Sequence, residues 1–361
     1  MVKMSEKKEL NKRKKIALIG TFPPPIGGTS IHVMRLREKL VDNGHDVMVY
    51  DTHGTGKAAF DGFISVHNYR KWITKYFFTM REDVIHSHTH EWKERAILSI
   101  GAKLHRKKMI FTFHSLREEL EELTYIDRKS IEVTLKYADT LICTSKGVRD
   151  KLLRWGCKED KLSIITPFIS PTKAEIDEKI SEDLNEFRQK HDYIISANAS
   201  NNDHYQGEDL YGLDMCVELI RYLHNKQINV GLIFAQTKVT DEAYYNEIKK
   251  RIDDYGIEEK VFFVTKPASF IPILKISDIF VRPTNTDTCG ISVNESLQLG
   301  IPAIASDVCE RADGTILFHS RNIEEFIDKA EMCISKLDSE KKKIKILSVK
   351  EGFQEIVRVY T

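Results

Sequence analysis

The apolar positions of this chain form short runs that alternate with longer amphipathic stretches. In the first half, the strand-like runs cover 15–20, 46–50, 83–86, 109–113, 140–144 and 162–166. In the second half, they cover 193–197, 230–235, 261–265, 279–282, 303–306 and 315–318. The segments between the runs show helical spacing, as at Ile31, Met34, Leu36 and Leu40. Buried strands that alternate with helices predict two α/β domains, each built on a doubly wound parallel sheet.

Prolines and charged residues mark the boundaries of these domains. Residues 1–14 are basic and predict a solvated tail. The segment 167–171 (PFISP) interrupts the alternation, so a first domain at 15–170 and a charged linker at 171–189 are expected. A second domain follows at 190–338. The last part, 339–361, predicts a terminal helix, with Phe353, Ile356, Val357 and Tyr360 at helical spacing.

Composition excludes several classes of protein. With 361 residues, the chain is long enough for two domains. A formal net charge of +1 argues against general binding of nucleic acid. Six cysteines are scattered without a CxxC pair, which favours reduced thiols over disulfides or a zinc site. There is no apolar run of membrane-spanning length and no signal peptide, so a cytoplasmic protein is expected.

The stretch 279–318 carries the strongest chemical pattern. A buried strand at 279–281 leads through a polar loop to a helix at 290–299, and the next strand follows at 302–306. Asp287 precedes the helix and Glu295 lies within it, about 12 Å apart if the eight intervening steps are helical. Backbone N–H groups of Cys289, Gly290 and Ile291 would bind an anion such as a diphosphate between the two carboxylates. The alternative is a solvated helix with Asp287 as its N-cap and Glu295 as a surface acid.

This stretch resembles the nucleotide-sugar motif of retaining glycosyltransferases of family 4, which have the GT-B fold. The motif places an acid seven residues before a Glu and continues with a Gly-Ile/Val-Pro turn and a strand that ends in Ser or Thr. Here Asp287, Glu295 and the run 299–306 (LGIPAIAS) follow it, with Asp in place of the usual first Glu. The resemblance implies that Asp287 contacts the donor sugar and Glu295 the ribose. It also implies two Rossmann-like domains that face a cleft, with a C-terminal helix that crosses back to the first domain.

Two features of the first domain fit the same resemblance. The loop 21–28 (TFPPPIGG) lacks the GxGxxG fingerprint of dinucleotide enzymes, but Gly27 and Gly28 could let a phosphate or acceptor approach the backbone. A turn that merely joins strand to helix is the alternative. His114 ends the strand 109–113, and the family has a His there, close to the donor sugar and its leaving phosphate. A structural histidine is the alternative for His114, and His32 is placed on the acceptor side.

The chain departs from the family where the donor phosphates are held. The usual Arg and Lys-Gly are replaced by Asn198 or Ala199 and by Tyr211-Gly212. Lys238, Lys266, Arg282 and Arg311 are possible substitutes, and Lys266 is favoured because it follows the strand 261–265.

No metal site is expected from the sequence. The chain contains no pair of aspartates spaced as Asp-x-Asp, a pattern that binds metal in other glycosyltransferases. His86, His88 and His90 alternate along an extended segment and would share one face, but no further carboxylate or Cys pattern supports metal binding.

The segment 69–81 (YRKWITKYFFTMR) mixes basic and aromatic residues. Such a helix could lie on an anionic membrane, at the inner face of the cell membrane, with a lipid-linked acceptor. An amphipathic helix packed on the sheet is the alternative.

Together these features predict a metal-independent, retaining glycosyltransferase that needs no cofactor. It would move a sugar from a nucleotide diphosphate sugar to a saccharide or lipid-linked saccharide, as in bacterial polysaccharide synthesis. The predicted catalytic residues are His114 and Asp287, and the donor-binding residues are Gly27, Gly28, Lys266, Thr288, Cys289, Gly290, Ile291 and Glu295. The alternatives are a non-catalytic scaffold of the same fold and a nucleotide-sugar epimerase.

Overall fold

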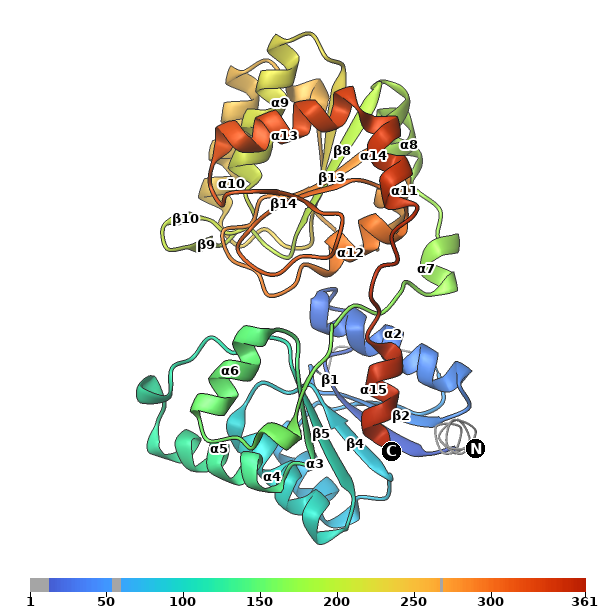
Figure 1. Ribbon diagram of the computed structural model, residues 1–361, viewed down its shortest axis with the longest axis vertical. Coiled ribbons are helices and arrows are strands. Elements are labelled where there is room, and N and C mark those ends of the chain that lie inside the picture. Colours follow the sequence, from blue (N-terminus) through green and yellow to red (C-terminus); the bar gives the residue numbers. More distant parts are fainter. Residues whose placement is uncertain (1–12, 54–59, 267–268) are drawn as a thin grey trace. The chain divides into compact units, whose positions relative to one another are not determined.

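The computed structural model describes residues 13–53, 60–266 and 269–361. Within it the chain forms two compact units (Figure 1). Unit 1 contains the chain up to Ile169 together with Glu351–Thr361, and unit 2 contains Ser170–Lys350. Each unit has its own parallel sheet with helices on both faces, as the alternation of strands and helices predicts.

The sheet of unit 1 is entirely parallel in the described residues, with strand order β3-β2-β1-β4-β5-β6-β7. The strands are β1 Lys15–Gly20, β2 Asp46–Asp51, β3 Phe63–Ser65, β4 Val84–Ser87, β5 Lys108–Phe113, β6 Thr140–Cys143 and β7 Leu162–Ile164. The helices are α2 Gly28–Asp42, α3 Tyr69–Thr79, α4 Trp92–Leu104, α5 Tyr125–Tyr137, α6 Lys146–Arg154 and α15 Phe353–Tyr360, with short 3-10 turns at Leu120–Glu122 and Glu159–Lys161. The strand β3 lies at the edge of the sheet and was not predicted, because its three residues are only partly buried.

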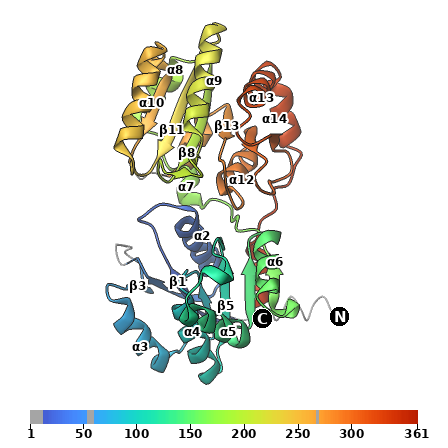
Figure 2. The ribbon, with the colours of Figure 1, turned by 90° about the vertical axis from the view of Figure 1, so that its left-hand side faces the viewer.

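Both faces of this sheet are buried, which explains why its strands are mostly apolar. Ala17 and Ile19 of β1 pack in one cluster with α3, α4, α5 and α6. Ile16 and Leu18 pack on the other face with α2 and α15. The sheet therefore lies between two layers of helices (Figures 1 and 2).

The C-terminal helix returns to unit 1, as predicted. Phe353, Ile356, Val357 and Tyr360 of α15 are buried in the same cluster as β1. A Cβ at Gly352 would lie 2.1 Å from the carbonyl oxygen of Thr166, so the chain approaches β7 closely before α15 begins. The returning segment is shorter than the predicted 339–361, because Leu337–Ile344 forms α14 in unit 2.

Unit 2 contains a parallel sheet with strand order β12-β11-β8-β13-β14-β15. Its strands are β8 Tyr193–Ala199, β11 Val230–Gln236, β12 Val261–Val264, β13 Ile279–Arg282, β14 Ala303–Ser306 and β15 Ile316–Phe318, and β9 His204–Tyr205 pairs separately with β10 Glu208–Asp209. The helices are α7 Lys173–Asp177, α8 Glu182–Gln189, α9 Leu213–Asn225, α10 Glu242–Asp254, α11 Ile271–Ile276, α12 Ile291–Gln298, α13 Ile323–Ser335 and α14, with a 3-10 turn at Glu258–Lys260.

The helices of unit 2 also form two layers. On one face of its sheet, α9, α10 and α13 share a core with alternate residues of β8, β11 and β13. On the other face, α11, α12 and α14 cover β13 and β14, while α8 covers β8 and β11. The segment 171–189, predicted as a linker, contains α7 and α8, and Leu184 and Phe187 of α8 pack against this sheet.

The strand order places the candidate residues at comparable points of the two sheets. In unit 1 the order changes direction between β1 and β4, and in unit 2 it changes direction between β8 and β13. Ligands of doubly wound sheets bind beyond the carboxyl ends of the strands at such points. His88 follows β4, and Arg282 is the last residue of β13.

Candidate functional site

The loop between β13 and α12 holds a buried cluster of three charged side chains. Asp287 Oδ2 accepts hydrogen bonds from Arg282 Nε at 2.5 Å and from Arg311 Nη1 at 2.7 Å. The side chain of Arg311 is 1% exposed, and those of Arg282 and Asp287 are each 12% exposed. Asp287 is therefore neither a helix cap nor a surface acid, but the shared partner of two arginines.

Both arginines are fixed by further contacts with the strand ends. Arg311 donates to the Ser306 carbonyl oxygen at 3.1 Å and to Thr284 Oγ1 at 3.2 Å. Arg282 Nη1 donates to Asn198 Oδ1 at 3.2 Å, so the end of β8 contacts the end of β13. The cluster thus spans three neighbouring strands and has little freedom to rearrange.

The charges of the cluster stabilise one another. Burial raises the pKa of Asp287, but the adjacent Arg282 and Arg311 guanidinium groups outweigh that effect and hold the pKa well below its usual range. Asp287 is therefore a carboxylate at neutral pH, and the three side chains carry a net positive charge. A net positive charge at the end of a parallel sheet suits an anionic ligand.

The cluster packs directly against the start of α12. Gly290 is the N-cap residue of this helix and has a φ of 70°, in the left-handed region. A Cβ at Gly290 would lie 2.4 Å from Arg311 Nη1 and 3.0 Å from Asp287 Oδ2. Only glycine allows this backbone conformation and this close approach together. The guanidinium groups and the amino end of α12 therefore form one positive surface.

The other residues of the motif are distributed along the same loop and helix. Thr288, Cys289 and Ile291 are half-buried around Gly290. Glu295 is 5% exposed, so the interpretation of Glu295 as a surface acid is wrong. Asn198 Nδ2 donates to Ser292 Oγ at 2.8 Å and ties the first turn of α12 to β8.

The four predicted substitutes for the phosphate contacts separate into two groups. Arg282 and Arg311 lie together at Asp287. Lys238 is exposed after β11, and Lys266 is exposed after β12 at the edge of the sheet. The structure thus brings Arg282 and Arg311, and not the favoured Lys266, to the start of α12. The sequence signal for Arg282 is its position as the last residue of a buried strand.

At Tyr211 and Gly212, which replace the family's Lys-Gly pair, the backbone N–H groups are bonded to a carboxylate of the chain itself. Asp209 accepts hydrogen bonds from the backbone N–H groups of Tyr211 at 2.8 Å, Gly212 at 2.9 Å and Leu213 at 3.0 Å. Its Oδ2 also accepts a hydrogen bond of 2.5 Å from Tyr244. Asp209 therefore closes the N-terminus of α9. An acid just before a helical pattern is a capping signal that our sequence reasoning missed.

The predicted glycines of unit 1 lie at the start of α2. Gly27 is the N-cap residue of α2, with an extended backbone, and Gly28 is the first residue of the helix. A Cβ at Gly27 would meet no heavy atom of the described residues within 4 Å. The backbone here is accessible to a ligand, although a turn that joins strand to helix has the same geometry.

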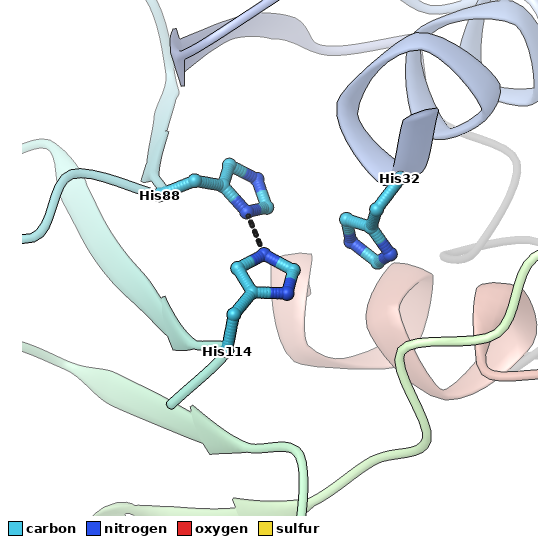
Figure 3. A group of neighbouring side chains, drawn as sticks. All are labelled: His32, His88 and His114. Atoms are coloured by element: carbon cyan, nitrogen blue, oxygen red, sulfur yellow. Dashed lines mark hydrogen bonds between the residues drawn. The ribbon is translucent and has the colours of Figure 1, made fainter. Parts of the chain in front are cut away.

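Three histidines converge at the carboxyl ends of β4 and β5. His88 follows β4, His114 follows β5, and His32 projects toward both from α2 (Figure 3). His88 Nδ1 and His114 Nε2 lie 3.0 Å apart, and the ring centroid of His32 lies 5.0 Å from that of His114. The expectation that His86, His88 and His90 share one face is only partly met, since His90 is exposed.

The histidines of this group are uncharged at neutral pH. Burial lowers the pKa of His32 to about 4 and that of His86 to about 3. Burial also lowers the pKa of His88 and of His114 well below the usual value, and neighbouring histidines add to the effect. Each ring therefore presents one N–H donor and one lone pair.

The helix α3 is predicted either as a membrane contact or as a helix packed on the sheet. It has buried residues that pack in unit 1 as well as exposed aromatic and basic residues. Ile73 and Tyr76 are buried, and Trp72 stacks on Tyr76. Phe78 is 71% exposed, and the basic residues Arg70, Lys71 and Lys75 of the same helix are also exposed. In the described part of the chain, no helix has the length and apolar character needed to cross a membrane.

Comparisons with known proteins cover both units. The family model described as Glycosyltransferase Family 4 matches residues 26–173, and the model described as Glycosyl transferases group 1 matches residues 206–345. Alpha-monoglucosyldiacylglycerol synthase of Streptococcus pneumoniae is 24% identical over 334 residues, which span 79% of this chain and 69% of the synthase.

Solved structures match nearly the whole chain. A glycosyltransferase from Rickettsia africae is 15% identical, with a TM-score of 0.72 over 97% of this chain and 98% of that chain. HepE of Anabaena, solved in complex with UDP-glucose, is 14% identical, with a TM-score of 0.67 over 96% of this chain and 94% of that chain. At these identities the matches show a shared fold of two Rossmann-like domains.

Proposed function

This chain belongs to the family 4 glycosyltransferases and has their GT-B fold, and from this premise we propose that it transfers a sugar, with retention of configuration, from a nucleotide diphosphate sugar. The observation that carries the proposal is the cluster of Arg282, Asp287 and Arg311 at the start of α12. HepE was solved with UDP-glucose, which supports a nucleoside diphosphate sugar as the donor class.

Arg282 would contact the donor diphosphate in place of the missing Arg and Lys-Gly, and the buried Arg311 would add positive charge behind it. A guanidinium group presents several N–H donors in a planar fork that suits phosphate oxygens. The amino end of α12 adds backbone donors on the same side. Both arginines are fixed by strand ends, so little reorganisation is needed when the ligand binds.

Asp287 would contact the sugar of the donor, and Glu295 would contact its ribose. Asp287 Oδ2 is engaged by the arginines, which leaves Oδ1, the acceptor for the Thr288 amide at 2.9 Å, as the oxygen for a sugar hydroxyl. Glu295 would bind the ribose, as the family motif implies. Replacing Glu295 with alanine should then weaken nucleotide binding strongly.

The chemical step would depend on positioning and on charge stabilisation. Two guanidinium groups oppose the negative charge that develops on the departing diphosphate, so we propose that the donor site works without a metal ion. In this scheme His114 contacts the donor sugar or its leaving phosphate, and His32 lies on the acceptor side. Transfer that is unchanged by EDTA would support this scheme, and loss of transfer in EDTA would contradict it.

A lipid-linked acceptor is our proposal for the second substrate, in a cytoplasmic protein that contacts the inner face of the membrane. The name of the Streptococcus relative specifies a glycolipid product, which supports this class. Phe78 and its basic neighbours on α3 would provide the membrane contact. Binding to vesicles with anionic lipid should weaken in Phe78→Ser, and the control Tyr125→Ser changes an exposed aromatic residue of α5.

The experiment that tests the donor proposal is calorimetry with UDP, GDP and their sugars. We expect binding of at least one ligand to the wild type and at least tenfold weaker binding by Arg311→Gln and Glu295→Ala. Lys238→Ala, which replaces an exposed lysine, is the control. No binding by the wild type at millimolar ligand would favour the scaffold alternative.

The scaffold alternative is supported by one specific observation. Asp209 occupies the backbone donors at the start of α9, where relatives would offer the Lys-Gly pair to phosphate. NMR analysis of the reaction products distinguishes a retaining transferase from a nucleotide-sugar epimerase. A new glycosidic bond with the donor's anomeric configuration supports retaining transfer, whereas an altered sugar formed without acceptor supports an epimerase.

A further inference from the structure

The histidines of unit 1 include two ring nitrogens that are buried without a partner. His32 is 2% exposed and His88 is 1% exposed. Within the described residues, His32 Nε2 and His88 Nε2 have no hydrogen-bond partner. A buried polar atom without a partner usually costs about 1–3 kcal/mol, so a ligand that pairs with His32 Nε2 would be favoured.

The hydrogen bond of His32 fixes which of its nitrogens has a free lone pair. Its Nδ1 lies 2.7 Å from the carbonyl oxygen of Pro167. A carbonyl oxygen can only accept, so Nδ1 carries the proton and Nε2 carries the lone pair. The lone pair of Nε2 is available to bind a cation.

We propose that His32, His88 and His114 bind one transition-metal dication of the zinc type, through one ring nitrogen each. The ligand atoms of the three side chains lie within 4.8 Å of one another (Figure 3). Zn–N bonds of 2.0–2.1 Å in a tetrahedral site place two nitrogens about 3.4 Å apart. His88 Nδ1 and His114 Nε2, at 3.0 Å, are already close to that spacing, and small side-chain rotations would bring His32 into range.

Burial alone does not distinguish the three proposed ligands from other histidines, because the neighbouring His86 is buried as well. His86 is fully buried, but its Nδ1 lies 2.7 Å from Tyr360 Oη and its Nε2 lies 2.7 Å from Thr112 Oγ1. Both of its nitrogens are thus satisfied by unit 1 itself. Its ring packs 4.4 Å from that of His88, measured between centroids, and helps to orient the ligand without joining it.

Three protein nitrogens leave the fourth position of a tetrahedral ion open. His114 is only half-buried, so this position lies on its accessible side, where water or an anionic group can bind. An ion there would occupy nitrogens that the proposed transfer reaction needs free. Zinc should therefore inhibit transfer reversibly, although the metal site itself does not depend on the proposed function.

The test uses the full chain after treatment with a chelator and a titration with Co²⁺ or Zn²⁺. We expect one Co²⁺ per chain, the visible absorption of tetrahedral Co²⁺ and its loss when Zn²⁺ is added. Zn²⁺ should also raise the melting temperature of the wild type by mass action. Both measurements use the wild type, so neither depends on whether a variant folds.

Variants then assign the ligands. His32→Ala and His88→Ala should each bind Co²⁺ at least tenfold more weakly, with folding checked by circular dichroism. His67→Ala, which replaces an exposed histidine of the same unit, is the control and should bind as the wild type does. No Co²⁺ uptake by the wild type at millimolar concentration would overturn the proposal. Equal affinity in the wild type, His32→Ala and His88→Ala would also overturn it.

Discussion

Asp287 and Arg311 form a buried ion pair, with 2.7 Å between Oδ2 and Nη1. Arg311 is also bonded to Ser306 and Thr284, so removal of the carboxylate cannot free its side chain to reach solvent. Arg282 shares the same carboxylate oxygen. Asp287 is therefore a counter-charge that the two guanidinium groups share.

Replacing Asp287 with asparagine should destabilise unit 2 as well as abolish transfer. The change removes the carboxylate that two neighbouring buried cations share, and breaking a buried pair costs about 3–5 kcal/mol. Urea unfolding at neutral pH measures the loss. Asp313→Asn, which changes an exposed acid of the loop after β14, should alter the free energy of unfolding by less than about 0.5 kcal/mol. Equal stability of the two variants would show that the arginines do not depend on Asp287.

Replacing Gly290 with alanine should displace the arginines without changing any charge. The new Cβ would lie 2.4 Å from Arg311 Nη1, and the φ of 70° is strained for alanine. We expect a stability loss of about 1 kcal/mol or more and at least tenfold weaker binding of the donor nucleotide. Gly147→Ala, at an exposed position of α6, is the matched control, because among the described residues its Cβ would meet only Ser145 Oγ, at 3.9 Å, and its φ does not lie in the left-handed region. Unaltered calorimetry in Gly290→Ala would argue against a ligand at this helix end.

The fold was predictable because each local signal agreed with the tertiary structure. Strands buried on both faces are mostly apolar, and β1, β8 and β13 each contain a run of consecutive apolar residues. The amphipathic pattern of α15 predicts only that this helix covers an apolar surface, and the family resemblance implied that the surface belongs to the first domain. No comparable apolar run marks β3, which is short and only partly buried.

The candidate site was predictable only where its residues are neighbours in sequence. Asp287, Gly290 and Glu295 form one motif and lie on one loop and helix. Arg311 reaches Asp287 from the loop after β14, and such a meeting depends on the strand order of the sheet. His32 likewise joins His88 and His114 only because α2 packs beside β4 and β5. No spacing rule along the chain connects these residues.

Acid should destabilise unit 1 through its buried histidines. The folded pKa of His32 is about 4, below its ordinary 6.5, so the unfolded chain binds a proton in this interval that the folded chain does not. The free energy of unfolding therefore falls as pH decreases from 6.5 to 4, by up to about 1.4 kcal/mol per pH unit for each such histidine. His86, His88 and His114 change in the same direction.

Urea unfolding at several pH values between 7.5 and 4.5 measures this dependence. His32→Asn should show a shallower loss of stability than the wild type, because it removes one of the groups that the unfolded chain protonates. His67→Ala changes an exposed histidine and should follow the wild type. If His32→Asn loses stability as steeply as the wild type, His32 is not held neutral by the fold.

The hydroxyl of Tyr360 should contribute to the attachment of α15. Tyr360 is 1% exposed, and its Oη lies 2.7 Å from His86 Nδ1. Tyr360→Phe keeps the packing of the ring but leaves His86 Nδ1 without this partner, which should cost about 1–3 kcal/mol. Hydrogen exchange should then show faster opening of α15, while Tyr125→Phe, at a tyrosine that is 69% exposed, should behave as the wild type does. Unchanged exchange in Tyr360→Phe would mean that apolar packing alone holds the terminal helix on unit 1.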